Sequence, residues 1–231
     1  LVLVLLNGRP LALSAEVEQA DALLEAWSPG IQGGNAVADV VFGDCNPAGR
    51  LTTSFPRNVG QIPIYYNHLA TGRPYNPESI RYSSSYIDVP NTPLFPFGFG
   101  LSYTEFVYGA VAADKLALNG DETLTLSVTV TNCGERSGEE VVQLYLRDPV
   151  ASIARPVKEL KGFEKIRLTP GQSRVVRFTI RPEALGFYKS DLTYVWEAGD
   201  FDFFIGPSSA TTNAIRVSWQ KPEPAAAVRS K

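Results

Sequence analysis

The residues best suited to chemistry lie in a loop-like stretch near the middle of the chain. Between Asn58 and Pro93, proline and glycine recur every few positions and tyrosines are interleaved with arginines. Aromatic rings stack on apolar faces, and guanidinium groups donate several hydrogen bonds, so together they suit the binding of a sugar. The candidate binding residues are Arg73, Tyr75, Arg81 and Tyr82. The alternative, which the residue types favour over sugar binding at this point, is that these side chains bury the linker against a neighbouring domain.

Two other features look like chemical sites but are better explained by structure. His68 is the only histidine, and no serine, cysteine or second histidine lies at a useful spacing from it, which disfavours a catalytic role. Gly30, Gly33 and Gly34 lie where a phosphate-binding loop would, between an expected strand and an expected helix. No Gly-Lys-Ser/Thr sequence and no complete G-x-G-x-x-G motif follows, so we interpret them as a tight turn.

The composition narrows the class of protein. With 231 residues, 44% of them hydrophobic, the chain has the length of two ordinary domains. The net charge of -3, without a lysine or arginine run, argues against nucleic acid and anionic membranes as partners. Cys45 and Cys133 fall in different expected domains, so a disulfide framework is not expected. No metal-binding cluster or cofactor motif is visible, and no metal or cofactor is expected.

Residues 1–57 are expected to form part of an α/β layer. Leu1–Leu6 has the continuous apolar character of a buried parallel strand and is far shorter than the roughly 20 residues that span a bilayer. Further expected elements are a helix over Ala15–Ala20 with Ser14 as its N-cap, a strand over Asp21–Trp27, and a helix over Asn35–Phe42 that ends at Gly43. This alternation predicts a parallel sheet with crossovers. Since so few strands are present, we expect the chain to be the C-terminal part of a longer protein, which completes the sheet.

The segment Leu94–Phe106 marks a change in the chain. Its proline and glycines exclude a helix and disfavour a regular strand. An apolar segment without regular structure must be buried on both sides, so we interpret it as an interdomain seam within a linker over residues 58–105. The aromatic residues of the expected seam are Phe95, Phe97, Phe99 and Tyr103.

From residue 106 to 220 a period of two residues dominates. Leucine and valine alternate with serine and threonine over Leu124–Val130, and the pattern continues in Val142–Leu146. Further strands are expected over Val157–Leu168, Val175–Ile180, Thr193–Glu197, Phe201–Ile205 and Asn213–Trp219. About seven short strands predict a β-sandwich of immunoglobulin or fibronectin III type. Glu139 and Glu140 are interpreted as solvated positions, and residues 221–231 as a disordered tail.

The order of these pieces resembles the C-terminal half of glycoside hydrolase family 3, in particular its bacterial periplasmic β-glucosidase group. The resemblance covers Leu1 to about Gly206 and is carried by LLEAWSPGIQGGNAVADVVFGDCNPAGRL, PLFPFGFGLSYT, RPVKELKGFEKIRLTPGQ and EAGDFDFFIG. It implies a barrel, an α/β sandwich and a fibronectin III-like domain in the intact enzyme. The implied fold class here is α/β plus all-β: the C-terminal part of an α/β sandwich, with a parallel-rich sheet and helices, followed by a fibronectin III-like β-sandwich.

The resemblance also implies an activity for the intact enzyme. Family members are retaining exo-glycosidases that remove terminal β-linked glucose, or in some cases xylose, with two carboxyl groups about 5–5.5 Å apart. In the family the nucleophilic aspartate lies in the barrel, and the acid/base glutamate precedes the strand that corresponds to Leu1–Leu6. No residue of this chain matches either position, so it is expected to hold no catalytic residue and to be inactive alone. The carboxylates rejected for these roles are Glu16, Glu25, Asp39 and Glu78.

The partners implied by the resemblance are the missing N-terminal barrel, the first half of the α/β domain, and a β-glucoside or oligosaccharide substrate. The implied location is periplasmic or secreted, and the Arg73 to Tyr82 loop is expected near the leaving-group side of the pocket. Two alternatives stay open: a non-enzymatic β-sandwich module that binds a carbohydrate or a protein, and one chain of a split two-chain glycosidase. A stable monomer with an ordered Leu1–Leu6 strand would favour the module.

Overall fold

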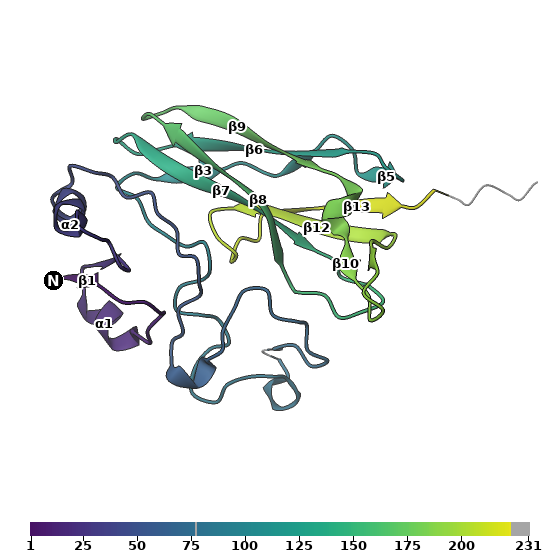
Figure 1. Ribbon diagram of the computed structural model, residues 1–231, viewed down its shortest axis with the longest axis horizontal. Helices are drawn as coiled ribbons and strands as arrows, with labels where there is room; N and C mark the ends of the chain where they lie inside the picture. Colours follow the sequence, from purple (N-terminus) through teal and green to yellow (C-terminus); the bar gives the residue numbers. More distant parts are fainter. Residues whose placement is uncertain (77, 223–231) are drawn as a thin grey trace, which may run out of the picture.

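The computed structural model describes residues 1–76 and 78–222, which form a small α/β segment, a long linker and a β-sandwich (Figure 1). The α/β segment contains β1 (Val2–Leu5), α1 (Ser14–Gln19), β2 (Ala22–Glu25) and α2 (Gly33–Phe42). Strands β1 and β2 pair in parallel, with Val2 opposite Ala22. The expected order of strand, helix, strand and helix is therefore confirmed.

The ends of the two helices differ in how well the sequence predicts them. The expectation that Ser14 caps α1 was wrong: Leu13 occupies the N-cap position, and the Ser14 hydroxyl donates to the Arg57 carbonyl oxygen at 2.9 Å. This hydroxyl ties the helix to the linker instead. Helix α2 begins at Gly33, where a Cβ atom would lie 2.6 Å from Cγ of Pro29, and ends as expected at Gly43, with φ of 86°.

The α/β segment has a small core and a partly exposed apolar surface. Its hydrophobic core cluster has three buried residues, Leu5, Leu13 and Phe55, and the Trp27 ring packs against Phe55 at 5.9 Å between centroids. Several large apolar side chains lie at the surface instead, namely Leu1, Val2, Leu6, Ile31 and Phe42. A parallel sheet is normally covered on both faces, so this surface is unusual for its type.

In the structure the irregular chain begins directly after α2 and extends over residues 43–105, which are called the linker from here on; it runs out from α2 and returns alongside itself. Its only helical turns among the described residues are the 3₁₀ helices η1 (Val59–Gln61) and η2 (Ile80–Tyr82). The returning part pairs with the outgoing part, because Phe55 and Phe95 form an antiparallel bridge and the Gly98 N–H donates to the Leu51 carbonyl oxygen at 2.7 Å. The linker thereby forms one long, closed excursion below the sandwich in Figure 1.

The sandwich consists of two main sheets. Its strands are β3 (Phe106–Tyr108), β4 (Ala112–Ala113), β5 (Ala117–Asn119), β6 (Leu124–Asn132), β7 (Gly138–Arg147), β8 (Glu159–Leu168), β9 (Ser173–Ile180), β12 (Gly199–Gly206) and β13 (Ala214–Gln220). One sheet has the order β5-β13-β12-β7-β8; the other has β3-β6-β4, with β9 also paired to β6. After the 3₁₀ helix η3 (Pro182–Leu185), strands β10 (Phe187–Tyr188) and β11 (Tyr194–Val195) form a separate hairpin.

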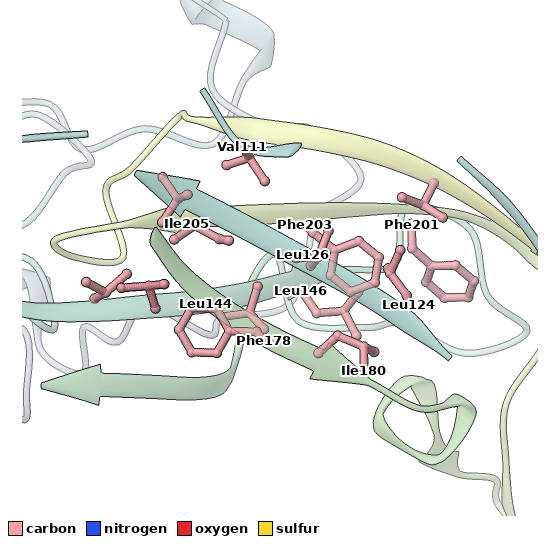
Figure 2. Close-up of a cluster of buried hydrophobic side chains, with 14 of the residues drawn as sticks. Val111, Leu124, Leu126, Leu144, Leu146, Phe178, Ile180, Phe201, Phe203 and Ile205 are labelled. Atoms are coloured by element: carbon pink, nitrogen blue, oxygen red, sulfur yellow. The ribbon is translucent and has the colours of Figure 1, made fainter. Parts of the chain in front are cut away.

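The core lies between the two main sheets, as the alternating pattern predicts (Figure 2). Leu124 and Leu126 of β6 are fully buried, and they face a layer that includes Leu144 and Leu146 of β7. A β-bulge between Leu144 and Tyr145 interrupts the register of β7 with β8. The Tyr145 side chain points away from the core, in alternation with Leu144 and Leu146. It is nevertheless fully buried, because Tyr66 of the linker packs against its ring.

Most of the expected strands are confirmed, with shifts at their ends. The expected strand over Thr193–Glu197 shrinks to the short β11 of the hairpin. Strands β3, β4, β5 and β10, each two or three residues long, were not expected from the sequence. The expected tail over residues 221–231 lies, from residue 223 on, outside the described residues. No helix in the described part of the chain is long and apolar enough to cross a membrane.

Candidate functional site

The four predicted binding residues lie together in one closed loop of the linker. The Ser84 N–H donates to the Arg73 carbonyl oxygen at 2.8 Å, which joins the two ends of the loop. All four side chains are exposed, and the guanidinium carbon of Arg81 lies 5.7 Å from the centroid of the Tyr82 ring. The loop therefore presents two arginines and two tyrosines to the surroundings: Arg73, Tyr75, Arg81 and Tyr82. A short loop with closed ends is typical of functional surface loops.

Two amides hold the returning side of this loop. Asn91 donates to the Ser84 carbonyl oxygen at 2.7 Å and accepts from the Tyr86 N–H at 3.1 Å. Gln61 is only 1% exposed, and its side chain donates to the Pro90 carbonyl oxygen at 2.7 Å. Sequence reasoning missed both residues, because their partners are defined by the folded path of the linker and leave no local motif.

The carboxylates rejected above and His68 form no paired site in the part of the chain that the structure describes. Glu25 accepts hydrogen bonds from the Trp27 N–H at 2.8 Å and from the Asn7 side chain at 3.2 Å, which is a structural arrangement. Glu16, Asp39 and Glu78 are exposed. His68 is exposed as well, with Nδ1 3.1 Å from the Leu69 carbonyl oxygen. Across residues 1–76 and 78–222, no group of three or more His, Cys, Asp or Glu side chains is placed to hold a metal ion.

A buried ionic cluster lies where the linker meets the sandwich. Arg50 contacts Glu140 of β7, and their side chains are only 7% and 3% exposed; the Tyr108 hydroxyl donates to the same carboxylate at 2.8 Å. The expectation that Glu140 is solvated was wrong, because its side chain lies on the inward face of β7, where Tyr108 of β3 and Arg50 enclose it. Burial raises the pKa of Glu140, although Arg50 and Tyr108 oppose this shift. Burial, together with Glu140, also raises the pKa of Tyr108.

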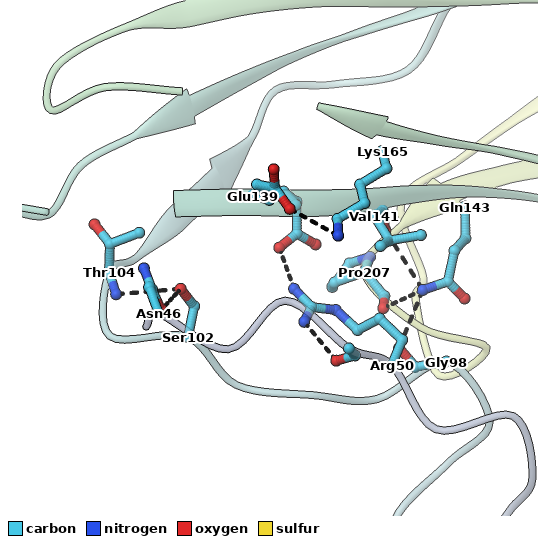
Figure 3. Close-up of polar contacts among 12 residues, drawn as sticks. Asn46, Arg50, Gly98, Ser102, Thr104, Glu139, Val141, Gln143, Lys165 and Pro207 are labelled. Carbon is cyan, nitrogen blue, oxygen red and sulfur yellow. Dashed lines mark hydrogen bonds and ion pairs between the residues drawn. The ribbon is translucent and has the colours of Figure 1, made fainter. Parts of the chain in front are cut away.

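On either side of this cluster, amide side chains form hydrogen bonds at the junction, which is the contact between the linker and the sandwich (Figure 3). Gln143 of β7 donates to the carbonyl oxygens of Gly98, at 3.0 Å, and Pro207, at 2.6 Å. Asn46 accepts from the Ser102 hydroxyl at 2.9 Å and donates to the Ser137 carbonyl oxygen at 3.0 Å. A cavity of about 260 Å³ lies beside Arg50, whose guanidinium group contacts the Glu140 carboxylate and the Gly49 carbonyl oxygen, while its Nε is buried without a hydrogen-bond partner among the described residues. The junction is thus a structural contact between distant parts of the chain.

The structure places the predicted seam residues at this junction. The Phe95 and Phe99 rings stack at 5.3 Å between centroids, and Phe97 stacks on Tyr66 at 4.4 Å. The Tyr103 hydroxyl donates to the Val40 carbonyl oxygen of α2 at 2.6 Å. Each of these side chains therefore contacts a part of the chain that precedes the sandwich.

Comparison with protein families gives two matches, in different parts of the chain. Residues 1–103 match the glycosyl hydrolase family 3 C-terminal domain. Residues 140–209 match the fibronectin type III-like domain. The two matches occur in the order that the seam and the change of periodicity indicate.

Individual relatives are similar over nearly the whole chain. A periplasmic beta-glucosidase of Salmonella typhimurium is 57% identical over 91% of this chain and 28% of its own length. A beta-xylosidase of Formosa agariphila is 44% identical over 94% of this chain and 29% of its own. The crystal structure of a beta-glucosidase from Listeria innocua in complex with isofagomine aligns with a TM-score of 0.90 and 47% identity, covering 95% of this chain and 31% of that one. The chain thus spans less than a third of the length of these relatives.

Proposed function

The chain belongs to glycoside hydrolase family 3, as the C-terminal portion of its β-glucosidase-type members, and we propose that it completes and buttresses the α/β domain of a retaining exo-β-glycosidase. The proposed activity of the intact protein is hydrolysis of terminal, non-reducing β-D-glucosyl residues. The names of the Salmonella and Listeria relatives support glucose as the sugar. The name of the Formosa relative makes β-linked xylose the second candidate.

The observation that carries this proposal is the incomplete cover of the parallel sheet. Strands β1 and β2 pair only with each other among the described residues, and Leu1, Val2 and Leu6 are largely exposed. Ile31 and Phe42 add further exposed apolar area from the segment around α2. In the proposed intact protein, the N-terminal barrel and the first half of the α/β domain cover this surface. The nucleophile and the acid/base belong to those parts.

An assay of two proteins tests the proposal. The intact polypeptide and the 25.2 kDa chain are each incubated with p-nitrophenyl β-glucoside and p-nitrophenyl β-xyloside. We expect hydrolysis by the intact polypeptide, faster with the glucoside, and none by the chain alone. Strong hydrolysis by the 25.2 kDa chain would overturn the assignment of the catalytic carboxylates to the missing part. Failure of the intact polypeptide on both substrates would overturn the proposed activity.

The closed loop is the proposed contribution of this chain to substrate binding. Arg73, Tyr75, Arg81 and Tyr82 are exposed, and we place them on the leaving-group side of the pocket, where they bind the sugar or aglycone that departs. Their exposure and the closure of the loop support this role. The contacts of Phe95, Phe97, Phe99 and Tyr103 support a structural role for the seam.

Alanine substitutions in the intact protein test the loop. Arg73→Ala and Arg81→Ala are expected to raise KM for a disaccharide, while Arg177→Ala is the control, since Arg177 is an exposed arginine on strand β9. If hydrolysis and inhibitor binding stay unchanged in both loop variants, the loop has only a structural role.

The proposed location of the intact protein is the periplasm or the exterior of the cell. The name of the Salmonella relative supports this location. Fractionation of cells that express the intact polypeptide, with detection of the protein in each fraction, tests it. Recovery only with the cytoplasmic fraction would contradict it.

A further inference from the structure

Tyr66 is an aromatic side chain through which the linker contacts the sandwich. Its ring stacks on Phe97 with 4.4 Å between centroids and 25° between planes, and it meets the edge of Tyr145 at 5.7 Å. Its hydroxyl accepts a hydrogen bond from the Leu160 N–H of strand β8 at 3.3 Å. Tyr66 therefore touches the seam and two strands of the sandwich at once.

A backbone attachment follows directly after Tyr66. The Val157 N–H donates to the His68 carbonyl oxygen at 2.9 Å, and Leu69 forms an antiparallel bridge with Pro156. Residues 156 and 157 immediately precede β8. The start of the closed loop is consequently fixed to the sandwich.

The end of the loop is fixed to a different part of the chain. The Pro90 carbonyl oxygen accepts from Gln61, and the Thr92 carbonyl oxygen accepts from Nε of Arg57 at 3.0 Å. Arg57 in turn holds α1, because its carbonyl oxygen accepts from the Ser14 hydroxyl. The start of the loop is thus hydrogen-bonded to the β-sandwich, and its end is linked through Arg57 to the α/β segment.

We propose that the fibronectin III-like sandwich sets the working position of the loop over residues 70–76 and 78–90, and that Tyr66 is its positioning residue. This inference rests on the proposed function, in which Arg73 and Arg81 contact substrate. The Arg73 side chain is only a few residues beyond the attachment, so displacement of Tyr66 displaces the guanidinium group. Because binding and reaction geometry respond steeply to small displacements, an attachment outside the pocket can govern substrate affinity.

The first experiment measures the loop itself in the intact protein. Hydrogen exchange of residues 70–76 and 78–90 is compared for wild type, Tyr66→Ala, Tyr66→Phe and Tyr65→Ala. Tyr65 is the matched control, because it is the neighbouring tyrosine and is 50% exposed. We expect faster exchange only in Tyr66→Ala, with peptides from β6 unchanged, and largely wild-type behaviour in Tyr66→Phe, which keeps the stacked ring. Unchanged exchange of the loop in Tyr66→Ala would overturn the inference.

Proteolysis gives an independent readout of the same loop. Trypsin cleaves after Arg81, whereas the bond after Arg73 precedes Pro74 and resists cleavage. Tyr66→Ala should therefore speed cleavage after Arg81 relative to Tyr65→Ala. Val157→Pro, which removes the N–H donor to His68 without touching Tyr66, should have the same effect and serves if Tyr66→Ala fails to fold. Cleavage at the wild-type rate in Val157→Pro would also contradict the inference.

Kinetics separate this inference from the proposed function. With a β-linked disaccharide, Tyr66→Ala should raise KM about tenfold and lower kcat much less, since it displaces binding groups rather than reacting ones. If Arg73→Ala raises KM but Tyr66→Ala changes neither KM nor exchange, the positioning role fails and the substrate role of the loop stands. If Tyr66→Ala frees the loop but neither variant changes KM, the substrate role fails.

Discussion

Glu139 and Glu140 are neighbours on β7, yet their side chains have opposite environments. Glu139 pairs with Lys165 at 2.7 Å, and these two side chains are 40% and 52% exposed. Glu140 points the other way along the pleat, against Arg50, and is nearly fully buried. An exposed pair contributes little to stability, whereas removal of one partner from a buried pair leaves the other charge unpaired. The two residues therefore form a natural comparison.

Glu140→Gln should destabilise the chain strongly, and Glu139→Gln should not. We expect a loss of about 3–5 kcal/mol of unfolding free energy for the buried position, because the Arg50 charge stays buried without its partner. The exposed position should change by less than about 1 kcal/mol. Urea denaturation of the 231-residue chain measures both. Equal midpoints for the two variants would show that the junction does not carry a buried charge pair.

Lys158 should make the stability of the sandwich depend on alkaline pH. Its Nζ donates to the carbonyl oxygens of Ser209 and Thr211 at 2.8 and 2.5 Å, and burial, with a smaller effect of Arg147, lowers its pKa to about 8. Between pH 8 and the ordinary lysine value of 10.5, the unfolded chain binds a proton that the folded chain does not. Stability from this group therefore rises as pH increases through that range and is lost as pH falls through 8.

The measurement is the difference in unfolding free energy between wild type and Lys158→Met, taken near pH 7.5 and near pH 9.5. Titration of other groups contributes to both proteins and cancels in the difference. The unfolding free energy of the wild type, relative to that of the variant, should be higher at the higher pH. A difference that does not depend on pH would mean that Lys158 keeps its ordinary pKa in the folded chain.

The sequence identifies candidate residues better than it identifies their neighbours. Arg73, Tyr75, Arg81 and Tyr82 were chosen from composition and loop length, and the structure brings them into one closed loop. Alternation along β7 places Glu140 on the same inward face as Val142 and Leu144, but the sequence does not reveal the partners that make burial of its charge possible, Arg50 and Tyr108. The stacking of Tyr66 on Phe97 depends on a similarly distant return of the chain.

At the scale of elements, the turn at Gly98 is the tightest point of the seam. Its φ is +81°, and a Cβ atom there would lie 2.0 Å from Oε1 of Gln143, the side chain that also binds the Gly98 carbonyl oxygen. Gly171, in the turn between β8 and β9, has a similar φ of +74° but nothing within 4 Å of a Cβ position. The two glycines share a left-handed backbone, which would be strained for any other residue, and they differ in available space.

Substitution of these glycines should separate strain from steric clash. Gly171→Ala is expected to lose about 1 kcal/mol of unfolding free energy from the left-handed backbone alone. Gly98→Ala should lose clearly more, because Gln143 must also move and break its hydrogen bonds to the carbonyl oxygens of Gly98 and Pro207. Urea denaturation of both variants checks this. A larger loss in Gly171→Ala would contradict the close packing of the seam.

Long elements were predicted well and short ones poorly, for a physical reason. Strand β6 shows four buried apolar residues in alternation, so its period is visible without the structure. Strands β4 and β10 are two residues long and cannot show a period at all. Strand β4 forms because the longer β6 supplies its hydrogen-bond partners, and β10 pairs with the equally short β11. Likewise, Ser14 looked like a helix cap, but its hydroxyl found a partner at Arg57.

At the scale of the whole molecule, the chain has two cores of unequal size. The sandwich core contains 20 buried residues, and the α/β segment has only Leu5, Leu13 and Phe55. The stability of a region follows the apolar surface it buries, so the two parts should open at different free energies. The exposed apolar residues around β1 and α2 stay in contact with water when the chain folds alone, so they add no stability to the α/β segment. The difference in opening free energy between the two parts is therefore larger.

Native-state hydrogen exchange on the 231-residue chain should therefore reveal two units. Amides of β1 and β2 should exchange through a low-energy opening, whereas amides of β6, β7 and β12 should exchange only through global unfolding. In the intact polypeptide, protection of β1 and β2 should rise toward that of the sandwich, because the proposed partner domains cover Leu1, Val2 and Phe42. Equal protection of both units in the isolated chain would show that the α/β segment is stable by itself. That result would favour an independent binding module over the C-terminal portion of a glycosidase.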